Sequence, residues 1–165
     1  MNYPAEINAE MTMRPLNIVW QRLVTSSGTT CDRCGRTFAA LQRAVTKLKD
    51  VLRPLDLAPI LETVELTQES FNRDPSASNR IWIAGRPLEE WLGARVGRSR
   101  CCSVCGEAEC RTVKIEQAVF ETIPEHLILR AALTAAARLI APVTEKVASE
   151  TEVRSCEPAC CADGG

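Results

Sequence analysis

CDRCGRTFAALQRAVTKLKDVL, residues 31–52, begins with two cysteines separated by two residues and continues as a long amphipathic segment. Its apolar side chains recur every three or four positions, which is the spacing of a buried helix face: Phe38, Leu41, Val45, Leu48 and Leu52. Pro54 follows, where a proline commonly ends a helix. The segment therefore predicts a helix that begins at the cysteine pair.

The position of Cys31 and Cys34 at a helix N-terminus has a chemical consequence. Unpaired backbone N–H groups and the positive end of the helix dipole stabilise an anion there. They lower the pKa of the first thiol from about 8.5 toward neutrality or below, and Arg33 and Arg36 add positive charge nearby. The resulting thiolate attacks a disulfide or binds a soft metal ion, and the spacing alone leaves both roles open.

Strands are predicted on both sides of this helix. LNIVWQRLV, residues 16–24, precedes it, while PILETVELT, residues 59–67, and RIWIAG, residues 80–85, follow it. QESFNRDPSASN, residues 68–79, predicts a short helix that runs into a polar loop. Residues 112–122 predict one more strand or a small hairpin.

A final helix is predicted from Pro124, because proline suits the first turn of a helix. The domain plan has three parts: an N-terminal arm over residues 1–16, a domain over residues 17–141, and a flexible tail over residues 142–165. Within the domain, residues 98–112 form a cysteine-rich loop.

The composition is that of one soluble globular domain of 165 residues, with 45% hydrophobic and 25% charged residues. A formal net charge of -1 and sparse aromatic residues argue against nucleic-acid binding. No nucleotide cofactor is expected, because neither GxGxxG nor GxxxxGK[ST] occurs. The adjacent Glu89 and Glu90 are expected at the surface, and the lone histidine, His126, is expected to be solvated.

Two features predict a cytoplasmic protein. The first residues lack the apolar run of a secretory signal. The most apolar stretch, residues 127–143, is short and interrupted by Arg130 and Arg138, so it predicts a packed helix and not a membrane crossing. In a reducing compartment, nine cysteines predict metal ligation or redox chemistry and not a disulfide framework.

A second thiol group, CCSVCGEAEC at residues 101–110, contains Cys101, Cys102, Cys105 and Cys110. The Cys102-x-x-Cys105 spacing can close around one tetrahedral ion, and Gly106 eases the turn. Two arrangements are open: the loop closes an all-thiolate site alone, or its Cys102/Cys105 pair joins Cys31/Cys34.

A third thiol group lies in the tail, where RSCEPACCADGG, residues 154–165, carries Cys156, Cys160 and Cys161. Three thiols on one segment can surround a thiophilic centre such as As(III), Hg(II) or Cu(I), because these ions prefer soft ligands. The tail is therefore a further candidate metal site.

Five motifs along the chain are similar to those of an uncharacterised prokaryotic family, a domain of unknown function. They are WQRLV, CxRCG, SNRIWIxGRPLEEWLG, CCxVCGxxECR and IPEHLILRA. The resemblance covers roughly residues 17–141 and brings no established activity.

The element order also resembles a thioredoxin-like fold: strand, CxxC, helix, strand, helix, strand and closing helix. This resemblance implies an α/β protein with a mixed sheet flanked by helices, the cysteine-rich loop as an insertion, and flexible tails. Thioredoxin-like oxidoreductases place a cis-proline before the third strand, against the CxxC. This chain has Ser78, Asn79 and Arg80 at that position, a departure that disfavours ordinary disulfide exchange.

The leading hypothesis is a thiolate-rich protein that binds zinc or another soft metal or metalloid ion in resistance, storage or delivery. The first alternative is a thiol–disulfide oxidoreductase, with Cys31 as the attacking thiolate, Cys34 as the resolving thiol and a thiol-containing protein as partner. The second alternative is an interaction module held together by structural zinc.

Overall fold

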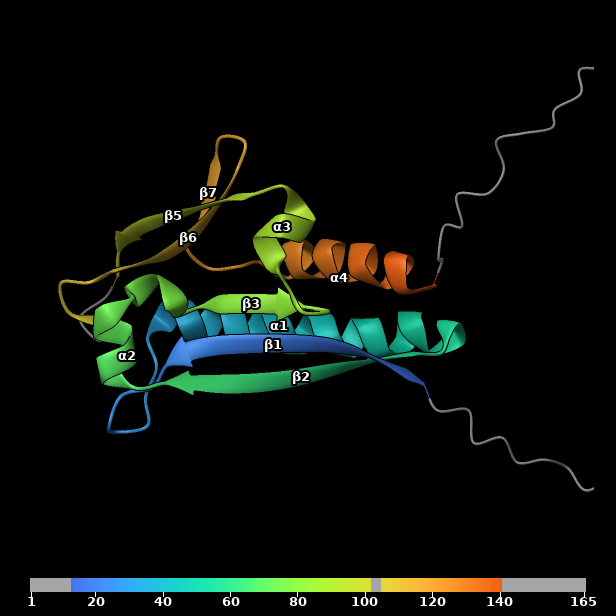
Figure 1. The fold of residues 1–165 in the computed structure, drawn as a ribbon, viewed down its shortest axis with the longest axis horizontal. Coiled ribbons are helices and arrows are strands. Elements are labelled where there is room, and N and C mark those ends of the chain that lie inside the picture. The colour runs from blue at the N-terminus through green and yellow to red at the C-terminus, as the bar shows by residue number, and fades with distance from the viewer. Residues whose placement is uncertain (1–12, 102–104, 141–165) are drawn as a thin grey trace, which may run out of the picture.

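The computed structural model describes residues 13–101 and 105–140. The protein is a mixed α/β protein in which helices pack against a four-stranded mixed sheet, with a smaller three-stranded sheet beside it (Figure 1). The predicted fold class, a mixed sheet flanked by helices, is confirmed at this level.

The larger sheet consists of β1 (Arg14–Leu23), β2 (Leu57–Leu66), β3 (Arg80–Ile83) and β4 (Arg86–Pro87). The smaller sheet consists of β5 (Arg95–Arg100), β6 (Glu109–Ile115) and β7 (Ala118–Phe120). The described residues also contain the helices α1 (Asp32–Leu52), α2 (Gln68–Arg73), α3 (Leu88–Leu92) and α4 (Glu125–Ile140). Two short 3-10 turns complete the structure: η1 (Arg53–Leu55) and η2 (Pro75–Ala77).

The larger sheet has the strand order β2-β1-β3-β4. β1 and β2 are parallel, so a crossover is needed between them, and α1 supplies it. β3 runs antiparallel to β1, and β4 runs antiparallel to β3. This topology agrees with the element order on which the thioredoxin-like expectation rests. It places the start of α1, and with it the cysteine pair, beyond the end of β1.

The main core lies between the larger sheet and the pair α1 and α4. Trp20 of β1 is buried, stacks on Phe38 of α1 with ring centroids 4.9 Å apart, and donates its indole N–H to Asn79 at 3.2 Å. α4 packs against α1, and four small residues of α4 are buried: Ala131, Ala132, Ala135 and Ala136. The apolar C-terminal stretch is therefore a packed helix, as expected from its interrupting arginines. None of the helices in residues 13–101 and 105–140 is both long and apolar enough to cross a membrane.

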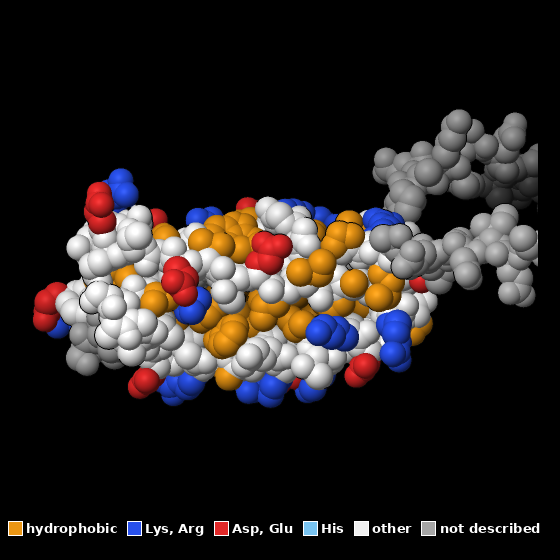
Figure 2. All heavy atoms as spheres, turned by 90° about the horizontal axis from the view of Figure 1, so that it is seen from below, with side chains coloured by type: hydrophobic (Ala, Val, Ile, Leu, Met, Phe, Trp, Pro, Cys, Tyr) orange, Lys and Arg blue, Asp and Glu red, His pale blue; other side chains and the backbone are white. Residues whose placement is uncertain are grey.

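The edge strand β2 has a surface of mixed polarity. Ile60 and Val64 are exposed, and Glu62 and Glu65 lie between and beside them. Hydrophobic and charged side chains are likewise interspersed over the face seen from below (Figure 2). Charges on an edge strand discourage pairing with another sheet.

Residues 98–112, which were expected to form a cysteine-rich loop, include parts of two paired strands. β5 and β6 pair in an antiparallel register from Arg95 opposite Lys114 to Arg100 opposite Glu109. Cys101 and Cys105 therefore lie between the two paired strands of a β-hairpin, and Cys110 lies within β6. Strand β5 was not predicted because RVGRSR is polar and carries a glycine.

Glu89 was expected at the surface, but its side chain is largely buried. Its carboxylate forms an ion pair with Arg111 of β6, and both side chains are largely buried. Arg111 also donates to the backbone carbonyl of Ser76 at 3.3 Å. This pair joins the smaller sheet to α3 and η2.

The core assignment predicts unequal effects for one substitution at two helix positions. Leu41→Ala, at a fully buried site on α1, is expected to lower the free energy of unfolding by about 2–5 kcal/mol, because it leaves a cavity. Leu133→Ala on α4, where the leucine is 42% exposed, is expected to change it by less than about 0.5 kcal/mol. Urea unfolding of both variants checks this prediction, and equal losses would contradict it.

Candidate functional site

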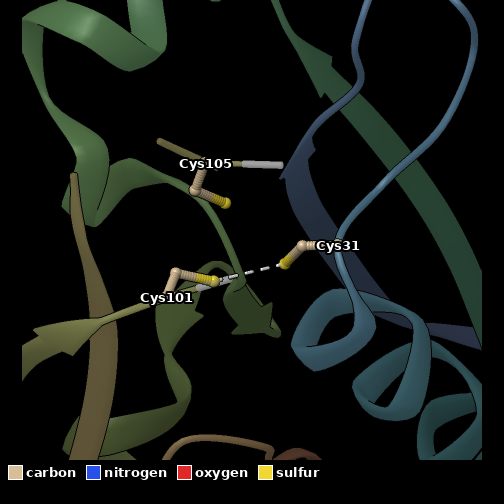
Figure 3. A group of neighbouring side chains, drawn as sticks. All are labelled: Cys31, Cys101 and Cys105. Carbon is tan, nitrogen blue, oxygen red and sulfur yellow. Dashed lines mark hydrogen bonds between the residues drawn. The ribbon is translucent and has the colours of Figure 1, made fainter. Parts of the chain in front are cut away.

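Three cysteines from two distant segments converge at the start of α1. Cys31 precedes the helix, whereas Cys101 and Cys105 belong to the turn between β5 and β6. Their sulfur atoms all lie within 4.8 Å of one another (Figure 3). The Cys101 thiol lies 3.7 Å from the Cys31 sulfur, toward which it donates, although the two residues are 70 positions apart.

Local backbone geometry explains how each sulfur is presented. Cys31 is the N-cap of α1 and has extended backbone angles, and its carbonyl accepts the N–H of Gly35 at 2.9 Å. On the hairpin side, Cys101 follows β5 directly. Gly106 adopts a positive φ of 62°, as expected for a glycine that eases the turn after Cys105.

Cys34 lies beside this group and faces the sheet. It is buried, and its sulfur lies 3.7 Å from the hydroxyl of Ser78, which accepts the backbone N–H of Leu23 at 3.0 Å. Ser78 is thus packed against the CxxC, at the position where the thioredoxin-like pattern has a proline. The next residue, Asn79, has a positive φ of 59°.

The thiols of the group have opposite tendencies to ionise. The Cys34 thiol, which donates to the Cys31 sulfur, is the main cause that lowers the pKa of Cys31 to about 5. The Cys34 backbone N–H and the Cys101 and Cys105 thiols act in the same direction, while burial opposes them.

The same contacts have the opposite effect on the neighbours of Cys31. Donation to Cys31 raises the pKa of Cys34, and so do burial and the negative charge of the Cys31 thiolate. Burial, followed by hydrogen bonds with Cys101 and Cys110, raises the pKa of Cys105. Cys31 is therefore the favoured thiolate, and its neighbours Cys34 and Cys105 keep their protons.

Cys31 borders a surface depression. With only 4% of its surface exposed, it lines a depression of about 400 Å³ together with Thr30, Asp32, Gly35 and Arg36. A small electrophile or another thiol can approach the thiolate from this side.

The group has the donor chemistry of a soft-metal centre. A Zn–S distance of about 2.3 Å in a tetrahedral site implies sulfur atoms about 3.8 Å apart. The Cys31–Cys101 pair already has this separation, and Cys105 lies within reach of both. Binding would release the protons of Cys101 and Cys105, so occupancy is expected to increase with pH.

Among the other predicted ligands, the structure describes Cys34 and Cys110. Cys110 is buried in β6 and contacts Cys105, but it is not part of the three-sulfur group. Cys102 lies outside the described residues, as do the tail cysteines Cys156, Cys160 and Cys161. His126 is exposed and has an edge contact with Phe120, with ring centroids 6.4 Å apart.

The structure thus joins the first cysteine pair to the hairpin through Cys31, Cys101 and Cys105. The sequence left two arrangements open: a site closed by the four cysteines of residues 101–110 alone, or one in which Cys102 and Cys105, at the usual chelating spacing, join Cys31 and Cys34. Recognition of the β5–β6 hairpin would have identified Cys101 as the residue that leaves the strand.

The pKa of Cys31 predicts a distinctive alkylation profile. In the reduced, metal-free protein, the iodoacetamide reaction at Cys31 should increase with pH around a midpoint near 5. Cys34→Ala removes the main hydrogen bond to the thiolate and should move this midpoint upward, whereas Cys110→Ala should leave it unchanged. Mass spectrometry of the labelled peptide measures both, and a midpoint near 8.5 in the parent protein would contradict the assignment.

Comparison with known proteins agrees with the family suggested by the five motifs. A protein of Archaeoglobus fulgidus described as an uncharacterized protein is 46% identical over 113 residues, which cover 68% of this chain and 82% of that protein. No solved structure matches the chain, and the thioredoxin-like fold therefore stays a prediction. The model of the family described as Domain of unknown function (DUF2703) matches residues 16–132. The chain belongs to this family.

Proposed function

We propose that this protein binds a soft metal or metalloid ion through the thiolates of Cys31, Cys101 and Cys105, in resistance, storage or delivery. The observation that carries the proposal is the convergence of three sulfur atoms, from segments far apart in the sequence, within 4.8 Å. Cys31 supplies the first anionic donor because its pKa is lowered. The ion then displaces the protons of the other two thiols.

The donor set favours thiophilic ions over hard ones. Thiolate ligands select ions such as Cu(I), Zn(II), As(III) and Hg(II), and oxygen ligands select Mg(II) and Ca(II). Three sulfur donors suit an ion with trigonal coordination, and As(III) and Hg(II) meet this requirement. We therefore infer that arsenite is the most informative probe of the centre.

Arsenite binding should depend on the three clustered thiols. The background is the full chain with Cys156, Cys160 and Cys161 replaced by serine, so that tail thiols do not contribute. Replacement of Cys31, Cys101 or Cys105 by serine should weaken arsenite binding by more than about 100-fold. Loss of a residue that only supports a metal ligand already weakens metal binding by about 10–100-fold. Cys110→Ser is the matched control and should bind as the background does.

Anaerobic titration followed by sulfur–arsenic charge-transfer absorption measures these affinities, and X-ray absorption counts the sulfur neighbours. Unchanged binding in all three variants would refute the centre. More arsenite bound by the unmodified chain than by the background would assign a separate site to the tail. Unfolding of the purified protein by a zinc chelator would instead favour the structural-zinc alternative.

The second candidate function is thiol–disulfide exchange, which the asymmetry between Cys31 and Cys34 favours. In this reaction the Cys31 thiolate attacks a substrate disulfide and releases one substrate thiolate. Cys34 then loses its proton, attacks Cys31 and releases the second thiolate, so that the CxxC is oxidised by two electrons as the substrate is reduced. A dithiol reductant would return the pair to its starting state.

Cys34→Ser separates the two functions, because Cys34 lies outside the three-sulfur group. If the protein binds ions, this variant should keep its arsenite affinity within about 10-fold of the parent, the lower limit for loss of a supporting group. If the protein exchanges disulfides, the parent should reduce insulin in the presence of dithiothreitol. The variant should then lose turnover and retain a mixed disulfide at Cys31, which mass spectrometry detects.

A further inference from the structure

Arg33 joins the two segments that carry the thiols. It lies in the first turn of α1, between Cys31 and Cys34, and its guanidinium reaches the end of β5. One terminal nitrogen donates to the Ser99 hydroxyl at 2.9 Å and to the Ser99 carbonyl at 3.4 Å. The other nitrogen donates to the carbonyl of Arg100 and, at 2.8 Å, to the carboxylate of Glu121.

Three of the four acceptors of Arg33 belong to Ser99 and Arg100, the last two residues of β5. Arg100 is followed at once by Cys101, so a hydrogen bond to its carbonyl restrains the backbone that carries the Cys101 thiol. The Ser99 hydroxyl also donates to the Glu121 carboxylate at 2.7 Å. Glu121 therefore balances the charge of Arg33 and holds the same strand residue.

The four hydrogen bonds of Arg33 need the donor geometry of a guanidinium group. Two of the four acceptors are backbone carbonyls, and the others are a hydroxyl and a carboxylate. The planar guanidinium can donate to several acceptors at fixed angles, whereas the lysine ammonium is a compact charge with a different reach. Only 12% of the Arg33 side chain is exposed, so water replaces few of these bonds.

We propose that Arg33 is the positioning residue of the three-thiol group: it holds the β5–β6 turn against the start of α1 and so places Cys101 beside Cys31. Its effect on ion binding rests on the proposed function. Its effect on the placement of the thiols does not.

The first test uses arsenite with Arg33→Gln and Arg33→Lys in the background without tail cysteines. Both variants should bind arsenite about 10–100-fold more weakly, as is typical when a group that orients a ligand is lost. Arg43→Gln is the matched control. Arg43 lies on the same helix and bonds the Glu125 carboxylate at 2.9 Å, but it is largely exposed and does not touch the hairpin. Thermal unfolding midpoints identify any general loss of stability.

The second test measures thiol placement without any ion. In a Cys34→Ser background, diamide takes two electrons and two protons from a pair of thiols and leaves a disulfide. Peptide mapping should find Cys31 joined to the hairpin turn in the parent and in Arg43→Gln. In both Arg33 variants, the yield of this disulfide should fall at least about 10-fold, in line with the expected loss of ligand orientation.

The two tests separate the proposals. Parent-like disulfide yields in both Arg33 variants would overturn the positioning role. If the parent binds no arsenite but the Arg33 variants still lose the disulfide, the proposed function fails and the positioning role stands. Loss of arsenite binding and of the disulfide in the Arg33 variants, but not in Arg43→Gln, would support both.

Discussion

The contact between the first turn of α1 and the β5–β6 turn is the constraint on which the candidate site depends. Neither segment alone sets the distances between the thiols of the group. Together they bring Cys101 to 3.7 Å from Cys31 and Cys105 into the same group. The parallel β1–α1–β2 crossover fixes one side of the contact, because it places the start of α1 at the end of the larger sheet. The β5–β6 register fixes the other side.

The hydrogen bonds within the group concentrate negative charge on one sulfur. Cys34, Cys101 and Cys105 donate to Cys31, which lowers its pKa, and the resulting charge helps the pKa of Cys34 and Cys105 to rise. An electrophilic ion would find the Cys31 thiolate ready to bind, whereas the Cys101 and Cys105 thiols would first have to lose their protons. A substrate disulfide would react with the same thiolate, and Cys34 would then act as the resolving thiol. Because Cys31 belongs to both sets, ion binding and disulfide exchange at this residue exclude each other.

Much of the larger sheet and its helices followed from local patterns. The periodicity of residues 31–52 predicted α1, and apolar runs bounded by turn residues predicted β1, β2 and β3. The alanine-rich stretch that forms α4 was correctly expected to be a packed helix. β5 and the buried Glu89–Arg111 pair were missed, because RVGRSR and two adjacent glutamates look solvated. β5 is ordered because it pairs with β6. Glu89 is buried because it pairs with Arg111 of β6, which also bonds η2.

The sequence by itself determined that this chain carries many thiols in short polar segments and that one pair begins a long helix. It also predicted the direction of the Cys31 pKa from the helix N-terminus, but the largest cause in the structure is the hydrogen bond from the Cys34 thiol. Only the tertiary structure decided which thiols meet. Sulfur atoms at positions 31 and 101 come together through strand pairing and through the bonds of Arg33 to a distant backbone, and no spacing within one segment encodes such contacts. Cys101 and Cys102 were both candidate ligands from the sequence; the strand register brings Cys101 into the group, and Cys102 lies outside the described residues.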